Sequence, residues 1–238
     1  MSHQVINHPW QLSYKEAVDL QRQLRERVIV ADQDNWPPET VAGADISYDR
    51  RHNMLFAAVL IFSYPDLTLM AVEQQSDVAS FPYIPGLLTF REGPLLAGIL
   101  HRCSRLPDLL VCDGQGIAHP RGLGLAAHLG VLFDLPTIGC AKSRLVGEYR
   151  QPGLGKGAMT PLQGATGDLL GMVVRTRERV KPVFVSPGHL ISVKRAAMMV
   201  LKLSTRYRLP EVTRQAHQYV NRMRQKWLAE IERPVASA

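Results

Sequence analysis

Three strand-like runs follow one another closely in the first half of the chain, and they constrain its fold more than any other feature. The runs cover residues 40–48, 54–63 and 68–77, and short turns join them. Connections this short join antiparallel strands, because a parallel pair needs a crossover of about a dozen residues or more. The sequence therefore predicts a three-stranded antiparallel meander, preceded by a helix with a capping box at Ser13 and Glu16.

The pattern changes after the third run. Helix-like and strand-like segments now alternate, which is typical of parallel β-α-β units. Three antiparallel strands followed by such units is the order of a ribonuclease-H-like α/β fold, a mixed sheet with helices on both faces. The expected segments are helices at 89–103 and 122–133, strands at 108–113 and 136–140, edge strands at 169–176 and 183–186, and helices near 189–203 and 210–231.

The length and composition fit one domain over residues 1–238, because 46% hydrophobic residues can form a sizeable core. From residue 189 to the end, ten Lys and Arg stand against three Glu, so this part carries the whole formal charge of +7. A basic helical region of this kind indicates a polyanionic partner, and a solvated helix face is the alternative. After about residue 230 we expect a tail that can be disordered.

Cysteine usage and hydropathy predict where the protein works. Cys103, Cys112 and Cys140 have neither disulfide-framework nor zinc-ligand spacing, so buried reduced thiols and a reducing compartment are expected. The N-terminus lacks the charged and apolar segments of a secretion signal. The longest apolar run, residues 54–62, is too short to span a bilayer. We therefore expect a soluble cytoplasmic protein without a membrane partner.

Two aspartates stand at unusual places in the predicted strands. Asp45 lies inside an apolar strand, and Asp113 directly follows residues 109–112, a short apolar strand. A carboxylate in an apolar strand is costly unless it is paired or binds a metal; an aspartate that caps a turn is the alternative. If the two strands are neighbours, both side chains meet at one edge of the sheet. Magnesium or manganese would relieve their repulsion, and Glu92 could supply a third oxygen.

Lys142 follows the next short strand and is expected to reach the same edge of the sheet. A lysine beside such a cluster can neutralise a phosphate in the transition state, and an exposed loop lysine is the alternative. No phosphate-binding loop is complete elsewhere. Ala127 stands at the third glycine position of the dinucleotide fingerprint, and Gly157 replaces the Ser or Thr of a P-loop. We therefore expect no nucleotide cofactor.

The loop at residues 81–86 is stiff, because Pro82 and Pro85 restrict its backbone on both sides of an aromatic and a branched apolar residue. A rigid tip carrying Tyr83 could act as a wedge between stacked bases, where an aromatic ring gains about 1–3 kcal/mol per base. The alternative is a buried loop that packs the core.

These residues belong to a series of short motifs. The motifs are residues 42–47, 82–88, 90–94, 113–116, 117–121, 141–143, 185–189 and 213–217. In this order they resemble one family closely, the endonuclease V family of deoxyinosine-directed nucleases. The resemblance runs from about residue 10 to residue 225, and the Pro-Tyr-Ile-Pro loop is its most specific part.

The resemblance implies a ribonuclease-H-like fold and a magnesium-dependent deoxyribonuclease of DNA repair. Such an enzyme recognises deoxyinosine (hypoxanthine) in damaged DNA. It hydrolyses the second phosphodiester bond 3′ to the lesion and leaves a 3′-hydroxyl and a 5′-phosphate. Asp45, Glu92 and Asp113 would be the catalytic metal ligands for Mg²⁺, for which Mn²⁺ can substitute. Lys142 would contact the phosphate, and His217 would be an outer metal or water ligand.

The resemblance also assigns residues to the recognition of the damaged base. One loop would separate the strands, several backbone positions would shape a pocket for the flipped base, and two histidines would lie near the nucleic acid. These are the wedge of Pro82, Tyr83, Ile84 and Pro85, the base pocket of Gly86, Leu88, Gly114 and Gly116, and the histidines His119 and His189.

Two other functions stay open at this point. One is a related nuclease that acts on inosine-containing RNA or on branched DNA. The other is a non-catalytic nucleic-acid-binding module, against which the three filled acidic positions argue. In each case we expect a monomer.

Overall fold

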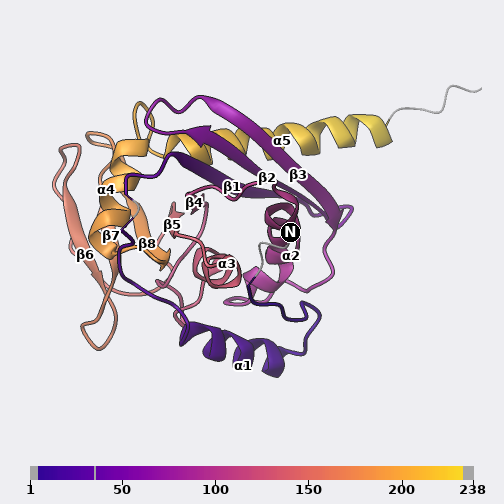
Figure 1. Ribbon diagram of the computed structural model, residues 1–238, viewed down its shortest axis with the longest axis horizontal. Helices are drawn as coiled ribbons and strands as arrows, with labels where there is room; N and C mark the ends of the chain where they lie inside the picture. The colour runs from indigo at the N-terminus through magenta and orange to yellow at the C-terminus, as the bar shows by residue number, and fades with distance from the viewer. Residues whose placement is uncertain (1–4, 35, 233–238) are drawn as a thin grey trace, which may run out of the picture.

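Eight strands form one mixed sheet in the computed structural model, which describes residues 5–34 and 36–232 (Figure 1). The strands are β1 (Thr40–Asp49), β2 (Met54–Ser63), β3 (Leu69–Val78), β4 (Leu109–Cys112), β5 (Thr137–Ala141), β6 (Met159–Gln163), β7 (Leu169–Val174) and β8 (Val183–His189). Their order is β3-β2-β1-β4-β5-β8-β7-β6. The first three strands are antiparallel, while β4 and β5 run parallel to β1. The predicted meander and the β-α-β units are confirmed.

Helices cover both faces of the sheet, as predicted (Figure 1). They are α1 (Tyr14–Arg25), α2 (Leu88–Arg102), α3 (Leu125–Phe133), α4 (Val193–Leu203) and α5 (Glu211–Ile231). Alternate residues of β1 point into two cores. Val41 packs with residues of α4 and α5, whereas Ala42 and Ala44 pack with residues of α2 and α3. Helix α1 lies outside α3, in Figure 1 below the sheet.

The prediction that the last two strand-like runs lie at a sheet edge is wrong. β8 lies inside the sheet between β5 and β7, and β7 also has a neighbour on each side. The edge is β6, which the sequence pattern did not predict. β6 is short and contains Pro161, which an edge strand tolerates. All residues of β8 are buried, so it lacks the alternation of a half-exposed strand.

Two helices begin later than predicted. Gly122 has a left-handed backbone with φ of +65°, so α3 starts only after it. β8 continues to His189, and α4 begins after Ser192, whose side chain accepts a backbone N–H of the first turn. Helix α5 continues to Ile231, beyond the predicted start of a tail. The remaining tail residues, 233–238, lie outside the described residues.

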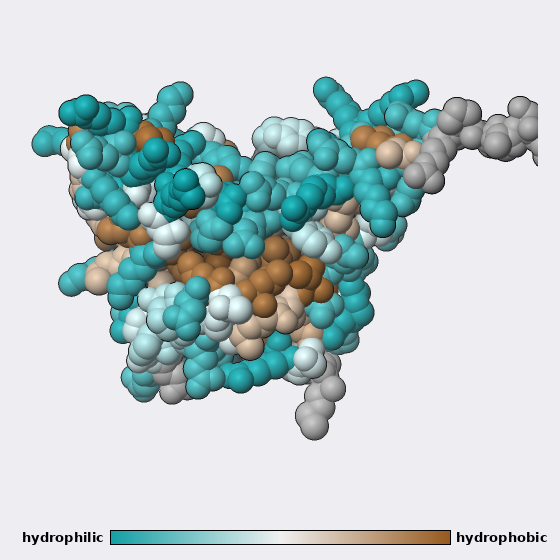
Figure 2. Space-filling model, turned by 90° about the horizontal axis from the view of Figure 1, so that it is seen from above, coloured by the Kyte–Doolittle hydropathy of each residue, from teal (hydrophilic) through white to brown (hydrophobic). Residues whose placement is uncertain are grey.

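The side of the molecule that carries β3 and α5 has an apolar band. β3 is an edge strand, and its Leu69 and Met70 are 47% and 61% exposed. Figure 2 shows hydrophobic residues gathered in a band between hydrophilic regions on this face. Within the described ranges, no helix is long and apolar enough to cross a membrane. The three cysteines are buried, as expected.

Candidate active site

Asp45 faces α5 because Gly43 lets that helix lie directly against β1. A Cβ on Gly43 would lie 2.2 Å from the backbone oxygen of Val212, which is closer than two such atoms can approach. Asp45 follows two positions later on the same face of the strand. Its Oδ2 lies 2.7 Å from Nδ1 of His217 on α5, and its Oδ1 accepts the backbone N–H of Ile46.

The structure brings Asp113 to the same place. β4 is the parallel neighbour of β1, and the backbone N–H of Asp113 donates to the carbonyl of Ala44 at 3.1 Å. One ligand atom from each of Asp45, Asp113 and His217 lies within 4.8 Å of the others. Two carboxylates and an imidazole at this spacing are a donor set that could hold a metal ion.

Glu92 on α2 lies near enough to the two aspartates for their charges to act on its carboxyl group, although the three close ligand atoms belong to Asp45, Asp113 and His217. Burial, followed by the charges of Asp45 and Asp113, raises the pKa of Glu92 to about 8. Burial and the charge of Asp113 likewise raise the pKa of Asp45 to about 6. Three carboxylates in a partly desolvated space resist simultaneous ionisation, and a divalent cation with a preference for oxygen relieves the repulsion. The residues therefore fit a hard divalent ion.

These shifts predict how the stability of the metal-free protein depends on pH. An acid with a raised folded-state pKa stabilises the fold while it is protonated, below its unfolded pKa near 4. That contribution is lost as the pH rises through about 6 for Asp45 and about 8 for Glu92. Glu92→Gln should therefore melt at a higher temperature than the wild type at pH 8 in EDTA, with a smaller difference at pH 5.

Thermal melts of both proteins across this pH range, with and without Mg²⁺, measure the effect. The ion should raise the melting temperature of the wild type more at pH 8 than at pH 5. Parallel melting curves for the wild type and Glu92→Gln across the range would contradict the burial of Glu92 among like charges.

Lys142 reaches the cluster from the end of β5, the next parallel strand. Its Nζ donates to Oδ2 of Asp113. The lysine side chain is 41% exposed, so it can leave this carboxylate for another anion without unfolding anything. Its backbone is held in place, because Nη2 of Arg208 donates to the Lys142 carbonyl at 2.6 Å. The backbone of Lys142 is therefore held beside the acidic cluster, while its exposed ammonium group has room to move.

Asn221 and Ser47 also belong to the site, although the sequence reasoning missed them. Nδ2 of Asn221 donates to Nε2 of His217 at 3.1 Å, and Oγ of Ser47 donates to Oδ1 of Asn221 at 2.9 Å. His217 Nε2 is thus an acceptor, which leaves Nδ1–H to donate to Asp45. The available signal was the spacing of four between His217 and Asn221 on one helix face.

Asn221→Ala should lower the rate of metal-dependent cutting by about 10–100-fold, the usual cost of losing an outer partner of a ligating group. The imidazole would then lose the donor that fixes its orientation. Steady-state cutting against magnesium concentration measures the effect, with Gln23→Ala, at an exposed amide on α1, as a surface control. A variant that cuts at the wild-type rate at every magnesium concentration would show that Asn221 does not support the site.

The loop that carries Tyr83 stands out from the surface. Phe81 and Leu87 are buried at its two ends, whereas Tyr83 is 69% exposed at its tip. Pro82 and Pro85 are exposed beside it. Only the two ends of the loop therefore pack into the core, and its tip with Tyr83 does not.

A hydrogen-bonded base supports this loop. Gly86 has φ of +79°, and its carbonyl accepts from the Arg121 guanidinium and from Nε2 of Gln21. His119 lies beside them, and burial and the charge of Arg121 lower its pKa to about 4. Leu88 follows as the first, 40% exposed residue of α2. Gly86 and His119 thus lie together at the base of the loop.

The other predicted site residues lie in different surroundings. Gly114 follows Asp113 directly, whereas Gly116 is pressed against β8, where a Cβ would lie 2.0 Å from the backbone oxygen of Pro187. His189 pairs with Thr137 at the start of β5, the strand end away from Lys142. It is buried and contacts the Ile29 N–H and Asp134. The structure does not bring His189 to the acidic cluster.

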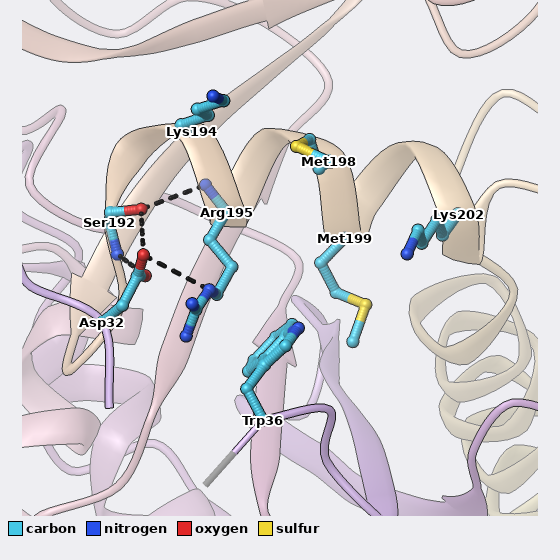
Figure 3. Close-up of a pocket in the computed structure, with 8 residues that line it drawn as sticks. All are labelled: Asp32, Trp36, Ser192, Lys194, Arg195, Met198, Met199 and Lys202. Atoms are coloured by element: carbon cyan, nitrogen blue, oxygen red, sulfur yellow. Dashed lines mark hydrogen bonds and ion pairs between the residues drawn. The ribbon is translucent and has the colours of Figure 1, made fainter. Parts of the chain in front are cut away.

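A pocket of about 360 Å³ lies elsewhere, beside α4 (Figure 3). Three of its polar side chains, Asp32, Ser192 and Arg195, are engaged with one another. Asp32 accepts from Ser192 and pairs with Arg195, whose guanidinium lies 4.8 Å from the ring of Trp36. Figure 3 shows the Arg195 side chain between Asp32 and Trp36. The pocket contains no part of the acidic cluster. The candidate active site is therefore the cluster itself, beside β1 and the carboxyl ends of β4 and β5.

Comparison with known proteins relates this edge to one family. A sequence model of Endonuclease V matches residues 22–218, which include every residue of the acidic cluster. Endonuclease V of Trichormus variabilis is 47% identical over 209 residues, 88% of this chain and 94% of that protein. The crystal structure of Endonuclease V from Streptomyces avermitilis has a TM-score of 0.86 at 40% identity and covers 94% of this chain and 98% of its own.

A further similar structure contains nucleic acid. It is Endonuclease V of Ciona intestinalis in complex with a 24mer DNA containing an inosine followed by a ribo-adenosine. Its TM-score is 0.78 at 29% identity, and the match covers 89% of this chain and 97% of that one.

Proposed function

The chain belongs to the endonuclease V family, and we propose that it is a magnesium-dependent deoxyribonuclease of DNA repair. It recognises deoxyinosine and hydrolyses the second phosphodiester bond on the 3′ side of the lesion, leaving a 3′-hydroxyl and a 5′-phosphate. One observation carries the proposal: Asp45 and Asp113, 68 positions apart in the sequence, meet with ligand atoms within 4.8 Å. Glu92 and Lys142 join them, which supplies both metal ligands and a phosphate partner.

In the proposed mechanism, Asp45, Asp113 and Glu92 would hold Mg²⁺, or Mn²⁺ in its place. A bound ion of this kind supplies Lewis-acid stabilisation of the phosphate and a more acidic water. His217, fixed by Asn221, holds Asp45 in one orientation. Lys142 moves from Asp113 to the scissile phosphate and neutralises charge that develops there. The three carboxylates thus serve the metal ion, His217 orients Asp45, and Lys142 serves the scissile phosphate.

Recognition of the lesion is proposed to use the exposed loop. Hypoxanthine pairs less well than adenine, so extruding it from the duplex costs less. Tyr83 with Pro82, Ile84 and Pro85 fills the vacated space. Backbone groups around Gly86, Leu88, Gly114 and Gly116 accept and donate to the flipped base, and His119 supports them. Adenine has the opposite donor and acceptor pattern, and a buried mismatch costs about 1–3 kcal/mol per group.

The basic helix α5 is proposed to bind the sugar-phosphate backbone, so binding should weaken steeply with salt. We further propose that the protein is one domain and acts as a monomer in the cytoplasm. The continuous sheet supports the single domain, and the buried free thiols support a reducing compartment.

Cleavage of three matched substrates tests the proposed function. They are a DNA duplex with one deoxyinosine, an RNA strand with one inosine, and an undamaged flap. We expect the deoxyinosine duplex to be cut fastest in magnesium and to be bound without cutting in calcium. Faster cutting of the RNA or the flap would favour a related nuclease, and binding without cutting in both metals would favour a non-catalytic module.

A further inference from the structure

A groove lies between β3 and the C-terminal half of α5, the helix that also carries His217 of the candidate active site. It has a volume of about 360 Å³. Phe56 of β2 is buried beneath Trp227 of α5, with ring centroids 5.5 Å apart. Across the groove, Tyr219 donates its hydroxyl hydrogen to Oε1 of Gln74 on β3 at 2.9 Å. The groove therefore has an aromatic base and one side made by a helix.

The helix side of the groove carries cations with few internal partners. Arg222 and Lys226 are exposed. Among the described residues Arg222 has no carboxylate within ion-pair distance, and its guanidinium lies 6.0 Å from the ring of Tyr219. Lys226 has only a loose contact of 4.0 Å with Glu230. Exposed cations beside half-exposed aromatic rings are the combination that binds an unpaired nucleic-acid strand, because phosphates meet the charges and bases stack on the rings.

Strand pairing and hydrogen bonds connect the groove to the acidic cluster. Ser47 lies opposite Phe56 in the register of β1 and β2, and it donates to Asn221, which donates to His217. A series of hydrogen bonds, from Ser47 through Asn221 and His217, therefore leads from the strand partner of Phe56 to Asp45. Its α5 residues lie beyond residue 218, where the match to the family model ends, whereas its strand residues Phe56, Gln74 and Ser76 lie within the matched segment.

We propose that this groove binds an unpaired segment of the nucleic-acid substrate beside the site of cutting. Phe56, Gln74, Tyr219, Arg222, Lys226 and Trp227 line it together with Ser76, Met223 and one acidic residue, Glu230. The inference rests on the proposed nuclease function, which separates strands next to the lesion. A single strand fits better than a duplex, because a duplex keeps its base faces stacked and offers such a surface only its backbone.

Binding of a short fluorescein-labelled oligothymidylate, measured by anisotropy in EDTA at several salt concentrations, tests the proposal without any cutting. Arg222→Ala/Lys226→Ala should weaken binding about tenfold or more at 0.1 M salt and lower the slope of log K against log salt by about 1.4, since each lost phosphate contact removes about 0.7. Trp227→Ala should weaken binding about tenfold through the loss of one stacked base, and Trp227→Phe should recover most of it.

The control is Arg27→Ala/Lys194→Ala, which removes the same charges from exposed positions near His189, at the other end of the sheet. It should keep the wild-type slope. Equal slopes for the two double variants would overturn the proposal. So would a dimer in the wild type that Arg222→Ala/Lys226→Ala breaks, because the groove would then bind a second copy of the chain.

Nicking of a deoxyinosine duplex in magnesium separates this inference from the proposed function. If the wild type nicks the duplex and the groove variants bind oligothymidylate normally, the groove proposal fails alone. If the wild type does not nick while the groove variants lose strand binding with the expected slope, the proposed function fails and the groove stands.

Discussion

Asp45→Ala and Asp113→Ala are each expected to lower the rate of nicking in magnesium by at least about a thousandfold, because a metal ion supplies several kcal/mol of transition-state stabilisation. Each substitution removes one of the two carboxylates that meet where Asp45, inside β1, lies beside Asp113, which directly follows β4. Binding of deoxyinosine DNA in calcium or EDTA should change little, since the wedge loop and α5 are untouched. Single-turnover nicking rates and anisotropy titrations measure the two quantities.

Asp66→Ala is the matched control, because Asp66 is an exposed aspartate in the turn between β2 and β3. It should nick at the wild-type rate. Thermal melts in EDTA should also show that Asp45→Ala is no less stable than the wild type at pH 8, because it removes a carboxylate whose pKa burial and the charge of Asp113 raise to about 6. Nicking at the wild-type rate by either active-site variant would rule out the metal assignment.

Tyr83→Ala is expected to lower kcat/KM on a paired deoxyinosine duplex by about tenfold or more, since one aromatic stacking contact is worth about 1–3 kcal/mol. The ring is 69% exposed, so its loss should not disturb the fold. On a strand in which the deoxyinosine is already unpaired, the same variant should cut nearly as fast as the wild type. Parallel assays on the two substrates separate strand opening from phosphate chemistry.

Tyr14→Ala serves as the control for this prediction, because Tyr14 is also an exposed tyrosine, 59% exposed at the start of α1. It should leave both rates unchanged. If Tyr83→Ala loses the same factor on the paired and the unpaired substrate, the ring contributes to something other than opening the duplex.

Local patterns predicted most of the fold. The bounds of β1 to β3 follow the sequence runs within a residue or two, because short turns and β-rich runs determine an antiparallel meander locally. The order of β6 to β8 did not follow from local pattern. Which strand pairs with β5 depends on contacts far apart in the chain, and the buried β8 differs little in sequence from an edge run.

The candidate site divides in the same way. The meeting of Asp45 and Asp113 could be predicted from an aspartate inside one strand and an aspartate directly after its parallel neighbour. Only the family resemblance placed His217 at this site. Local sequence pattern did not predict its contact with Asp45, because the contact depends on how α5 lies across β1, more than 170 positions away in the sequence. Gly43 is the residue that permits this approach. For His189 the sequence motif matched the family, but the residue pairs with Thr137 at the start of β5, the end of that strand away from Lys142.

The most direct test of the central claim is to incubate the protein with an end-labelled duplex that carries one deoxyinosine, plus magnesium, and to map the break. We expect a single nick at the second phosphodiester bond 3′ to the lesion, with a 3′-hydroxyl, a 5′-phosphate and the hypoxanthine still attached. An intact strand, a break at unrelated positions or a released base would contradict it.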